Sequence, residues 1–578
     1  MSFRANVRNL KKILRLCIRS AQNDRPTPLQ KPPFNKGGIT EAYTNKGVPN
    51  GFSLRLLLKL SLSIVGVFMF KKAISTLLVL GICLLLMTSC SENGANSDPF
   101  MGDVNGDGAL NNADLTLFND YLDGEATEIR YEFCDLDGNF KVDAEDAKIL
   151  EKYLNGKGSA LKGTPFGKAD EDVTANLEDL SVNNIRKWND LAIENITARN
   201  PYDMYTSNGL VMVAGGNSRD NKGPVIISGY SKGSTNAVDM GRLASEQINK
   251  FYDFGDFVAT VSVDARTWQY GDVYVKSKTE NKWASNLGVL KGNIHCYDMV
   301  KFGGKYFFCG SNVVYQEHDG LTTELGLASV FVYDGELSKK MNQSDFKEVE
   351  LIKNEKNIND DPGFYDTKIE GEIYKMQGLP RIYEFFKFNG KLYTFYFDQF
   401  SENYDEEHDY NGLYAYDEVS GNFVFDDSLN ADFLCELMGS TVQDAEKIQH
   451  DFQWGDRYYF VKNGLYSTKD FKFYGKNVIP NYQGYDVHDV VFKGDFAYVL
   501  ASKELDNGDF VNVVLETKNF VNFRTLFHFE TKLFARSFEF CNGEFYFGLG
   551  FAVTNVTNGE INDRNKECGR ILRYSYYK

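Results

Sequence analysis

One short pattern recurs from Ala169 onward and constrains the fold more than any other feature of the sequence. An aromatic residue is followed closely by Gly or Asp, and then by an aromatic-rich stretch. Five good copies are KFGGKYFFCG from Lys301, KFNGKLYTFY from Lys387, QWGDRYYFVK from Gln453, VFKGDFAYVL from Val491 and EFCNGEFYFG from Glu539, with weaker copies from Asp253 and Thr206. Gly or Asp allows a tight turn and alternating aromatics pack on a sheet, so each copy predicts a β-hairpin.

A further strand pair follows several of these hairpins, as in GLYAYDEVSGNFVF from Gly412 and GLYSTKDFKFYG from Gly464. Four strands in roughly 40 to 50 residues are typical of one β-propeller blade. We therefore predict an all-β fold class, with a seven-bladed β-propeller over residues 170–578. Six or eight blades remain open, because the long interval from Gly304 to Gly390 holds either an insertion or an eighth blade. Two β-sandwiches are the alternative. The repeats resemble kelch-like and sialidase-like propellers in general character, and match no specific family.

Two copies of a twelve-residue acidic pattern precede this region, DVNGDGALNNAD at 103–114 and DLDGNFKVDAED at 135–146. Calcium takes six to eight oxygen ligands, and such a loop supplies them from positions 1, 3, 5, 7, 9 and 12. The predicted ligands are Asp103, Asn105, Asp107, the carbonyl of Ala109, Asn111 and Asp114 in the first loop, and Asp135, Asp137, Asn139, the carbonyl of Lys141, Asp143 and Asp146 in the second.

An amphipathic helix is expected after each loop, from Leu115 and from Ala147. Both loops end in Asp instead of the Glu of an ordinary EF-hand, and neither follows a helical sequence. This doubled pattern resembles the type I dockerin domain, here a small α domain at 102–157 on the N-terminal side of the propeller. The resemblance implies calcium as cofactor and a cohesin module of a scaffold protein as partner. The implied contact positions are Asn112, Ala113, Ala144 and Glu145.

The chain departs from that family in two respects. The contact positions lack the Ser-Thr pair common in dockerins and differ between the two copies, which leaves partner identity and two-way binding open. Phe140 occupies position 6 of the second loop, where Gly normally allows a sharp turn. We therefore expect the second loop to bind calcium more weakly, or with adjusted geometry.

The segment MFKKAISTLLVLGICLLLMTSC from Met69 has the layout of a signal peptide. Two lysines precede an apolar run at 73–87, which is shorter than the roughly 20 residues of a membrane span. Its end resembles a bacterial lipobox, which implies cleavage before Cys90 and diacylation of that cysteine. We assign 69–89 to a lipoprotein signal peptide and 90–101 to a tether, placing the protein at the cell surface or on a periplasm-facing membrane. An ordinary secretory signal and an uncleaved anchor are the alternatives.

Residues 1–68 do not fit this organisation. Their apolar run at 54–68 is interrupted by Arg55 and Lys59, whereas a signal peptide carries its charges before the apolar core. Our hypothesis is that Met69 is the true start and that 1–68 are a mis-annotated upstream segment.

The formal net charge of −17 argues against nucleic-acid binding, which needs a basic face. The nine cysteines form no CxxC pair, so a zinc site is not expected. Free buried thiols are the favoured interpretation, and a Cys296–Cys309 disulfide is the alternative.

Polar residues stand four positions before the first aromatic of the five good hairpins. They are Asp298, Glu384, His450, His488 and Arg536. In the inner strands of a propeller they would ring one mouth of the channel, where they could perform acid–base chemistry or hold a ligand. Hydrogen bonding between blades is the favoured alternative. The sequence GYSKG at 229–233 matches a nucleophile elbow, but loop-like residues follow Ser231, so we expect a surface turn.

These features suggest a surface lipoprotein that a dockerin brings to a cellulosome-like, polysaccharide-degrading assembly, with a propeller that binds carbohydrate or protein. Trp268, Trp283 and Trp454 could stack on sugars if they are exposed. A glycoside hydrolase or polysaccharide lyase with its active site at the propeller mouth is the alternative function. In a third interpretation, the dockerin packs on its own propeller and recruits nothing.

Overall fold

The computed structural model describes residues 101–577, with gaps of which the longest span 162–169, 181–199, 217–223, 439–448 and 551–566. The predicted leader, Cys90 and the tether lie outside the described residues. Within the described residues, no helix is long and apolar enough to span a membrane.

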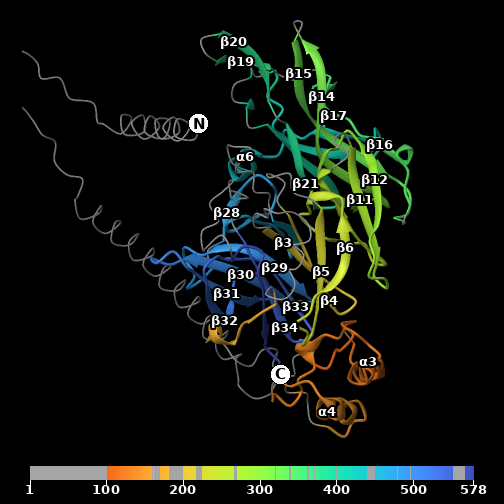
Figure 1. Ribbon diagram of the computed structural model, residues 1–578, viewed down its shortest axis with the longest axis vertical. Coiled ribbons are helices and arrows are strands. Elements are labelled where there is room, and N and C mark those ends of the chain that lie inside the picture. Colours follow the sequence, from red (N-terminus) through yellow and green to blue (C-terminus); the bar gives the residue numbers. More distant parts are fainter. Residues whose placement is uncertain are drawn as a thin grey trace, which may run out of the picture. The chain divides into compact units, whose positions relative to one another are not determined.

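The C-terminal region is a β-propeller, as predicted, and seven blades are found in the described part of the chain (Figure 1). The first blade comprises β3 (Asn200–Ser207), β4 (Leu210–Gly216), β5 (Val225–Ser231) and β6 (Val238–Leu243). The second comprises β8 (Tyr252–Asp253), β9 (Phe257–Val261), β11 (Tyr270–Ser277) and β12 (Ala284–Lys291). The third comprises β13 (His295–Phe302), β14 (Lys305–His318), β15 (Leu321–Tyr333) and β16 (Phe346–Glu348). Two short strands, β7 (Ser245–Gln247) and β10 (Val263–Ala265), link β4 to β13.

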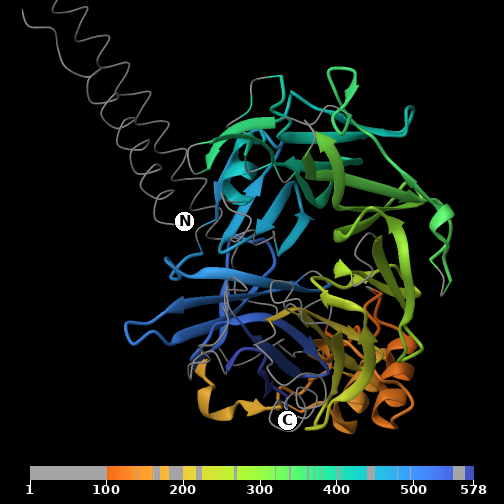
Figure 2. The same cartoon turned by 45° about the horizontal axis from the view of Figure 1, so that its top comes forward.

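The remaining blades follow in chain order, as the colour gradient from green to blue shows (Figure 2). The fourth blade comprises β21 (Arg381–Phe388), β22 (Lys391–Phe397), β23 (Gly412–Asp417) and β24 (Asn422–Phe425). The fifth comprises β25 (His450–Trp454), β26 (Arg457–Val461), β27 (Leu465–Thr468) and β28 (Tyr474–Lys476). The sixth comprises β29 (Asp486–Lys493), β30 (Phe496–Glu504), β31 (Phe510–Thr517) and β32 (Arg524–Thr531). The seventh comprises β33 (Ala535–Cys541), β34 (Glu544–Leu549), β35 (Ile571–Ser575) and β2 (Glu178–Asp179).

Closure of the ring joins the two ends of the propeller. Strand β2 pairs antiparallel with β35, so a segment that precedes the first blade completes the last one. Arg573 on β35 donates to Glu178 at 2.5 Å across this pair. Strand β1 (Glu171–Asp172) adds a fifth, parallel strand to the sixth blade. The edges that these two blades would otherwise expose are thereby covered.

The long interval between Gly304 and Gly390 is an insertion, and no eighth blade occurs among its described residues. Strands β14 and β15 form an elongated hairpin. Beyond β16, strands β17 (Leu351–Lys353) and β18 (Lys356–Asn357) extend the fourth blade's sheet, and β19 (Phe364–Ile369) pairs with β20 (Glu372–Gln377) as a separate hairpin. Helix α6 (Asp432–Met438) lies between the fourth and fifth blades in sequence.

The inner hairpins turn at the predicted Gly positions. In the first, fourth and seventh blades the turn is Asn-Gly, and both residues have positive φ: 53° and 67° at Asn208–Gly209, 49° and 74° at Asn389–Gly390, and 49° and 84° at Asn542–Gly543. A two-residue turn with positive φ at both positions matches the twist of the flanking strands, and Asn and Gly tolerate it best.

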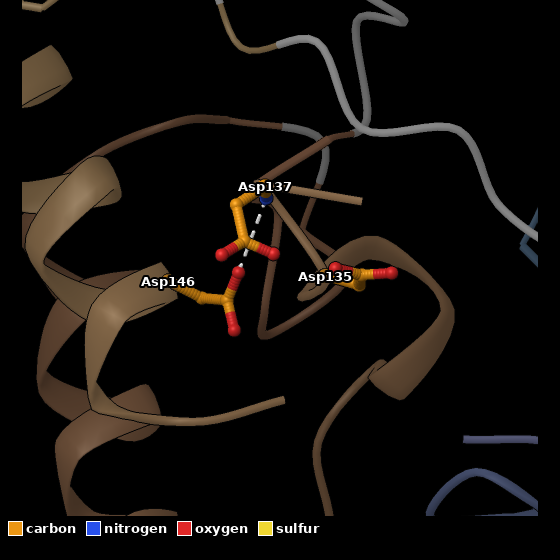
Figure 3. Close-up of side chains that lie close together, drawn as sticks. All are labelled: Asp135, Asp137 and Asp146. Atoms are coloured by element: carbon orange, nitrogen blue, oxygen red, sulfur yellow. Dashed lines mark hydrogen bonds between the residues drawn. The ribbon is translucent and has the colours of Figure 1, made fainter. Parts of the chain in front are cut away.

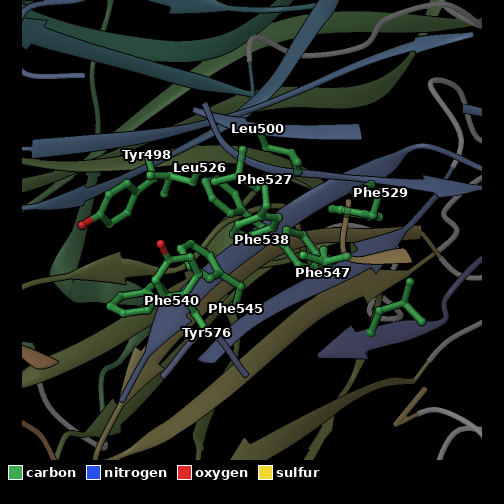
Figure 4. Close-up of a cluster of buried hydrophobic side chains, with 14 of the residues drawn as sticks. Tyr498, Leu500, Leu526, Phe527, Phe529, Phe538, Phe540, Phe545, Phe547 and Tyr576 are labelled. Carbon is green, nitrogen blue, oxygen red and sulfur yellow. The ribbon is translucent and has the colours of Figure 1, made fainter. Parts of the chain in front are cut away.

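The core consists of aromatic side chains packed between neighbouring blades. Between the sixth and seventh blades, Phe527 packs against Phe545 with ring centroids 5.0 Å apart, and Phe529 packs against Phe547 at 4.6 Å (Figure 4). Such edge-to-face and offset pairs add to the free energy gained by burial. The high aromatic content of the sequence therefore serves the packing of one blade on the next.

The small N-terminal domain contains helices α3 (Asn112–Leu122) and α4 (Ala144–Leu154), joined by a connector that includes the 3₁₀ turn η1 (Tyr131–Phe133). Phe118 and Leu150 are fully buried in its core, where Phe496 of the sixth blade joins them. Among the described residues, the six cysteines form no disulfide, and this includes the pair Cys296 and Cys309.

Candidate functional site

The two acidic loops have the same internal hydrogen bonds. In the first loop, the amides of Asp107 and Ala109 donate to the Oδ1 atoms of Asn105 and Asp107, at 2.9 and 2.8 Å. In the second loop, Asn139 and Lys141 donate to the equivalent residues, Asp137 and Asn139, at 3.0 and 2.7 Å. In both loops, the side chains at positions 3 and 5 therefore accept a hydrogen bond from the amide two residues further along.

The last acid of each loop connects the loop's beginning to its helix. Asp146 accepts from the amides of Leu136 and Asp143, at 2.8 and 2.9 Å, and Asp114 accepts from Asn105 and Asn111, at 3.2 and 2.9 Å. These acids are also the N3 residues of capping boxes, with Asn111 and Asp143 as N-caps. One carboxylate per loop thus fixes both the loop and the start of α3 or α4.

Three carboxylates of the second loop meet at one point. Oxygens of Asp135, Asp137 and Asp146 all lie within 4.8 Å of one another, and the Asp137 amide donates to Asp146 at 3.2 Å (Figure 3). Burial raises the pKa of Asp146 to about 6. Burial disfavours the negative charge of these clustered carboxylates, and a bound cation would offset that charge. Oxygen ligands of this kind suit a hard divalent cation such as calcium. Phe140 lies outside the described residues.

The first loop adjoins a basic side chain from the connector. Asp103 at position 1 is 1% exposed, and its Oδ1 accepts from the Gly106 amide at 2.8 Å. Its Oδ2 lies 3.7 Å from Nη1 of Arg130. That separation is within ion-pair range, so the guanidinium offsets part of the charge of the Asp103 carboxylate.

The four predicted partner-contact residues are on the surface. Asn112, Ala113, Ala144 and Glu145 are all exposed, in the first turns of α3 and α4. They therefore lie where a second protein can reach them.

The connector contacts the propeller. The sequence did not indicate which residues would make this contact. Thr127 accepts a hydrogen bond at its carbonyl from Nδ2 of Asn542, at 2.9 Å. Arg130 donates through Nη2 to the carbonyl of Lys493, at 3.2 Å. Tyr131 packs against Tyr577 with ring centroids 5.4 Å apart. A calcium loop does not need the two aromatic residues Tyr131 and Phe133. They are the feature of the sequence that could have indicated this contact.

The turn that contains Ser231 belongs to the same contact region. The amide of Ser234 donates to the carbonyl of Ser231 at 3.1 Å, which forms a turn and not the helix that a nucleophile elbow requires. Nζ of Lys232 in this turn lies 4.0 Å from the ring centroid of Tyr131. The GYSKG segment is therefore the end of β5 and the turn that follows it, and the turn contacts the small domain.

Four of the five polar residues predicted at the channel mouth lie at irregularities in the inner strands, whereas His450 begins β25, whose register is regular. The register shifts near Tyr202 in β3, Asp298 in β13, Glu384 in β21, His488 in β29 and Arg536 in β33. Such bulges re-aim side chains and expose backbone amides to new partners. The first strands of neighbouring blades contact one another here, as β3 does β33 and β13 does β21.

Buried acids at these bulges accept backbone hydrogen bonds from the following blade. Asp203 accepts from the amide of Phe251 at 2.7 Å, Asp298 from Phe385 at 2.8 Å, and Asp489 from Phe538 at 2.8 Å. Burial raises the pKa of Asp203 to about 7. The structure thus gives Asp298 the blade-joining role that was weighed against catalysis.

The two candidate histidines differ in environment. His450 Nε2 lies 2.6 Å from Oδ1 of Asp489; burial lowers the pKa of His450, but the charge of Asp489 outweighs it and the net shift is upward. His488 stacks on Phe534 at 4.2 Å and shares a 2.6 Å hydrogen bond with Ser502. Burial lowers the pKa of His488 to about 3, so this ring is neutral at physiological pH.

The other candidates are also engaged in packing. Arg536 lies over the ring of Tyr202 at 4.6 Å, and Glu384 is buried, with its carbonyl accepting from Thr394 at 3.0 Å. Trp454 donates to the carbonyl of Lys518 at 3.0 Å. Trp283 stacks on Phe251, with centroids 5.9 Å apart; the side chain of Trp268 lies outside the described residues.

Comparison with known proteins finds one family model and several similar solved structures. The family model described as Dockerin type I domain matches residues 101–155. No curated protein matches the chain. Similar solved structures include a computationally designed protein (TM-score 0.30, 8% identity, covering 66% of this chain and 98% of the other). The β-propeller domain of the trilobed protease from Pyrococcus furiosus (0.29, 8%, 56% and 82%) and a Penicillium chrysogenum α-L-arabinanase (0.27, 8%, 66% and 97%) are others.

Proposed function

We propose that this protein is a lipid-anchored surface protein, and that its dockerin domain binds calcium in both loops and docks to a cohesin module of a polysaccharide-degrading assembly. The family match at residues 101–155 is the observation that carries the proposal. The hydrogen bonding that both loops share and the carboxylate cluster of the second loop support it, as does the exposure of Asn112, Ala113, Ala144 and Glu145. Anchoring rests on the lipobox-like sequence ending at Cys90.

Calcium would be held by the side-chain oxygens at positions 1, 3, 5, 9 and 12 and the carbonyls at position 7 of each loop. Its charge would offset the carboxylates gathered there and fix the loops against the starts of α3 and α4. A domain of this size has a small core, so the metal would also contribute to its stability. Ordered helices are what a cohesin could then contact.

The propeller is proposed as a binding module for carbohydrate or protein. Asp298 and Asp489 accept hydrogen bonds from neighbouring blades, and His488 is buried against Phe534, so the polar bulge residues have structural roles. These contacts favour binding over hydrolysis. A polysaccharide screen with Glu384→Ala and His450→Ala tests the alternative, since turnover that both variants abolish would establish an enzyme.

Cohesin docking is tested by measuring the binding of the full chain to a panel of recombinant cohesin modules, with calcium and with EGTA. We expect binding that EGTA removes. Replacing Ala113 and Ala144 with Arg places bulky charges at the exposed contact positions and should abolish binding. The matched control is Glu151→Arg, at an exposed position further along α4. A chain that binds calcium but none of the cohesins would refute the docking proposal.

A further inference from the structure

We propose that the propeller carries a docking surface for its own dockerin, and that calcium in the first loop and this docking strengthen each other through Arg130. The docking surface consists of the hairpin turns Asn208–Gly209, Lys493–Gly494 and Asn542–Gly543, and the connector at 127–133 occupies it. The proposal rests on calcium binding by the dockerin and adds how that binding is transmitted to the propeller.

The fit of these turns to the connector is close. A Cβ atom built on Gly209 would lie 2.9 Å from the carbonyl oxygen of Thr127, and one on Gly543 would lie 2.6 Å from the ring of Tyr131. One on Gly494 would lie 2.5 Å from Nη2 of Arg130. The equivalent turn glycine of the fourth blade, Gly390, has open space around its Cβ position. The dockerin therefore covers the Asn-Gly turns of the first and seventh blades, but not the Asn-Gly turn of the fourth blade.

Arg130 touches the first calcium loop and the propeller at the same time. Its amide donates to the carbonyl of Val104 at 3.0 Å, and its guanidinium lies 3.7 Å from Asp103, which is position 1 of the loop. The same guanidinium donates to the carbonyl of Lys493 and lies over the ring of Phe133 at 4.1 Å. Ordering of the loop and placement of this side chain on the propeller therefore depend on each other.

Calcium binding and docking should favour each other, because each restricts the conformations of the same connector. Without a cation, Asp103, Asp107 and Asp114 repel one another, and a loop that opens releases Val104 and the Arg130 backbone bonded to it. Connector residues already held on the propeller have less conformational freedom to lose, so calcium binds more tightly. By linkage, calcium must strengthen docking by the same factor as docking strengthens calcium binding.

This arrangement differs from a dockerin that is sequestered by its own chain. The propeller covers the connector, whereas Asn112, Ala113, Ala144 and Glu145 stay exposed on the helices. Docking therefore leaves the predicted cohesin-contact positions accessible and holds them in one orientation relative to the propeller.

Hydrogen exchange of the full chain, with calcium and with EGTA, tests the coupling directly. Chelation should speed exchange at the turns 208–209, 493–494 and 542–543 by about tenfold, while the turn 389–390 keeps its rate. Unchanged exchange at the three docked turns, in a chain that calorimetry shows to bind calcium, would overturn the coupling alone. A chain that binds no calcium would overturn the calcium proposal as well.

Matched glycine variants test the reciprocal effect. Gly543→Ala and Gly390→Ala place the same side chain in Asn-Gly turns with φ of 84° and 74°, but only the first meets Tyr131. We expect Gly543→Ala to weaken calcium binding by about tenfold and Gly390→Ala to leave it unchanged. Arg130→Lys, which keeps the positive charge beside Asp103 but loses the guanidinium that donates to the carbonyl of Lys493 and lies over Phe133, should act like Gly543→Ala. Equal calcium affinities in all three variants and the parent would refute the proposal.

Discussion

Asp489 on β29 joins three blades, because its Oδ1 lies 2.6 Å from His450 of the fifth blade while its Oδ2 accepts from the amide of Phe538 in the seventh. The carboxylate is 3% exposed. This buried carboxylate gives the His450 ring and the Phe538 amide a hydrogen-bond acceptor, which both would otherwise lack away from water.

Asp489→Ala should therefore destabilise the propeller strongly. It leaves His450 and the Phe538 amide buried without this acceptor, and removal of one partner of such a buried pair costs about 3 to 5 kcal/mol. The measurement is the free energy of unfolding in denaturant. The control is Asp456→Ala, which removes an ion pair with Lys469 on an aspartate that is 73% exposed, and should therefore cost far less. Similar losses in the two variants would contradict the bridging role.

His488 should make the protein sensitive to acid. Its folded-state pKa of about 3 lies below the ordinary value of 6.5, so the stability linked to its neutral form is present above pH 6.5 and is lost as the pH falls toward 3. Between pH 7.5 and 5 the unfolded state gains about 2 kcal/mol from protonation of this residue. Melting temperatures of the parent and His488→Gln across this range measure the difference in slope.

The control for that comparison is Val521→Gln, at a side chain that is 64% exposed and carries no titratable group, so it should not alter the acid sensitivity. The burial argument for His488 fails if the parent and His488→Gln lose stability in parallel as the pH falls.

Calcium stoichiometry should separate the two loops. Asp135→Ala removes position 1 of the second loop, one of three carboxylates within 4.8 Å, and should reduce binding from two ions to one. Asp123→Asn, an exposed residue at the end of α3, serves as control and should keep two. Titration calorimetry counts the sites. Two ions bound by Asp135→Ala would show that the predicted ligand set is wrong.

The closing strand should be needed for a stable seventh blade. A propeller fragment that starts at 181 lacks β2 and leaves β35 as an open edge, which favours aggregation and lowers the melting temperature. A fragment that starts at 177 also lacks the dockerin and β1 but keeps β2, so it isolates the pairing of β2 with β35. We expect the shorter fragment to melt at least several degrees lower. Equal melting temperatures would show that pairing of β2 with β35 contributes little.

The sequence by itself determined the local elements of this protein. Turn chemistry and alternating aromatics fix each hairpin, as at Asn389–Gly390, because positive φ and the two-residue side-chain period are properties of short segments. The same holds for the two acidic loops, whose oxygens bond to amides two residues away.

Only the tertiary structure decided which distant groups meet. The pairing of β2 with β35, the bonds from Asp489 to His450 and Phe538, and the contact of Thr127 with Asn542 join residues far apart in the chain. No local spacing encodes such contacts, because they arise only when the ring closes and places the blades in fixed positions. The same closure brought Asp298 into a hydrogen bond between blades, the role that the sequence analysis favoured over a place in a catalytic site.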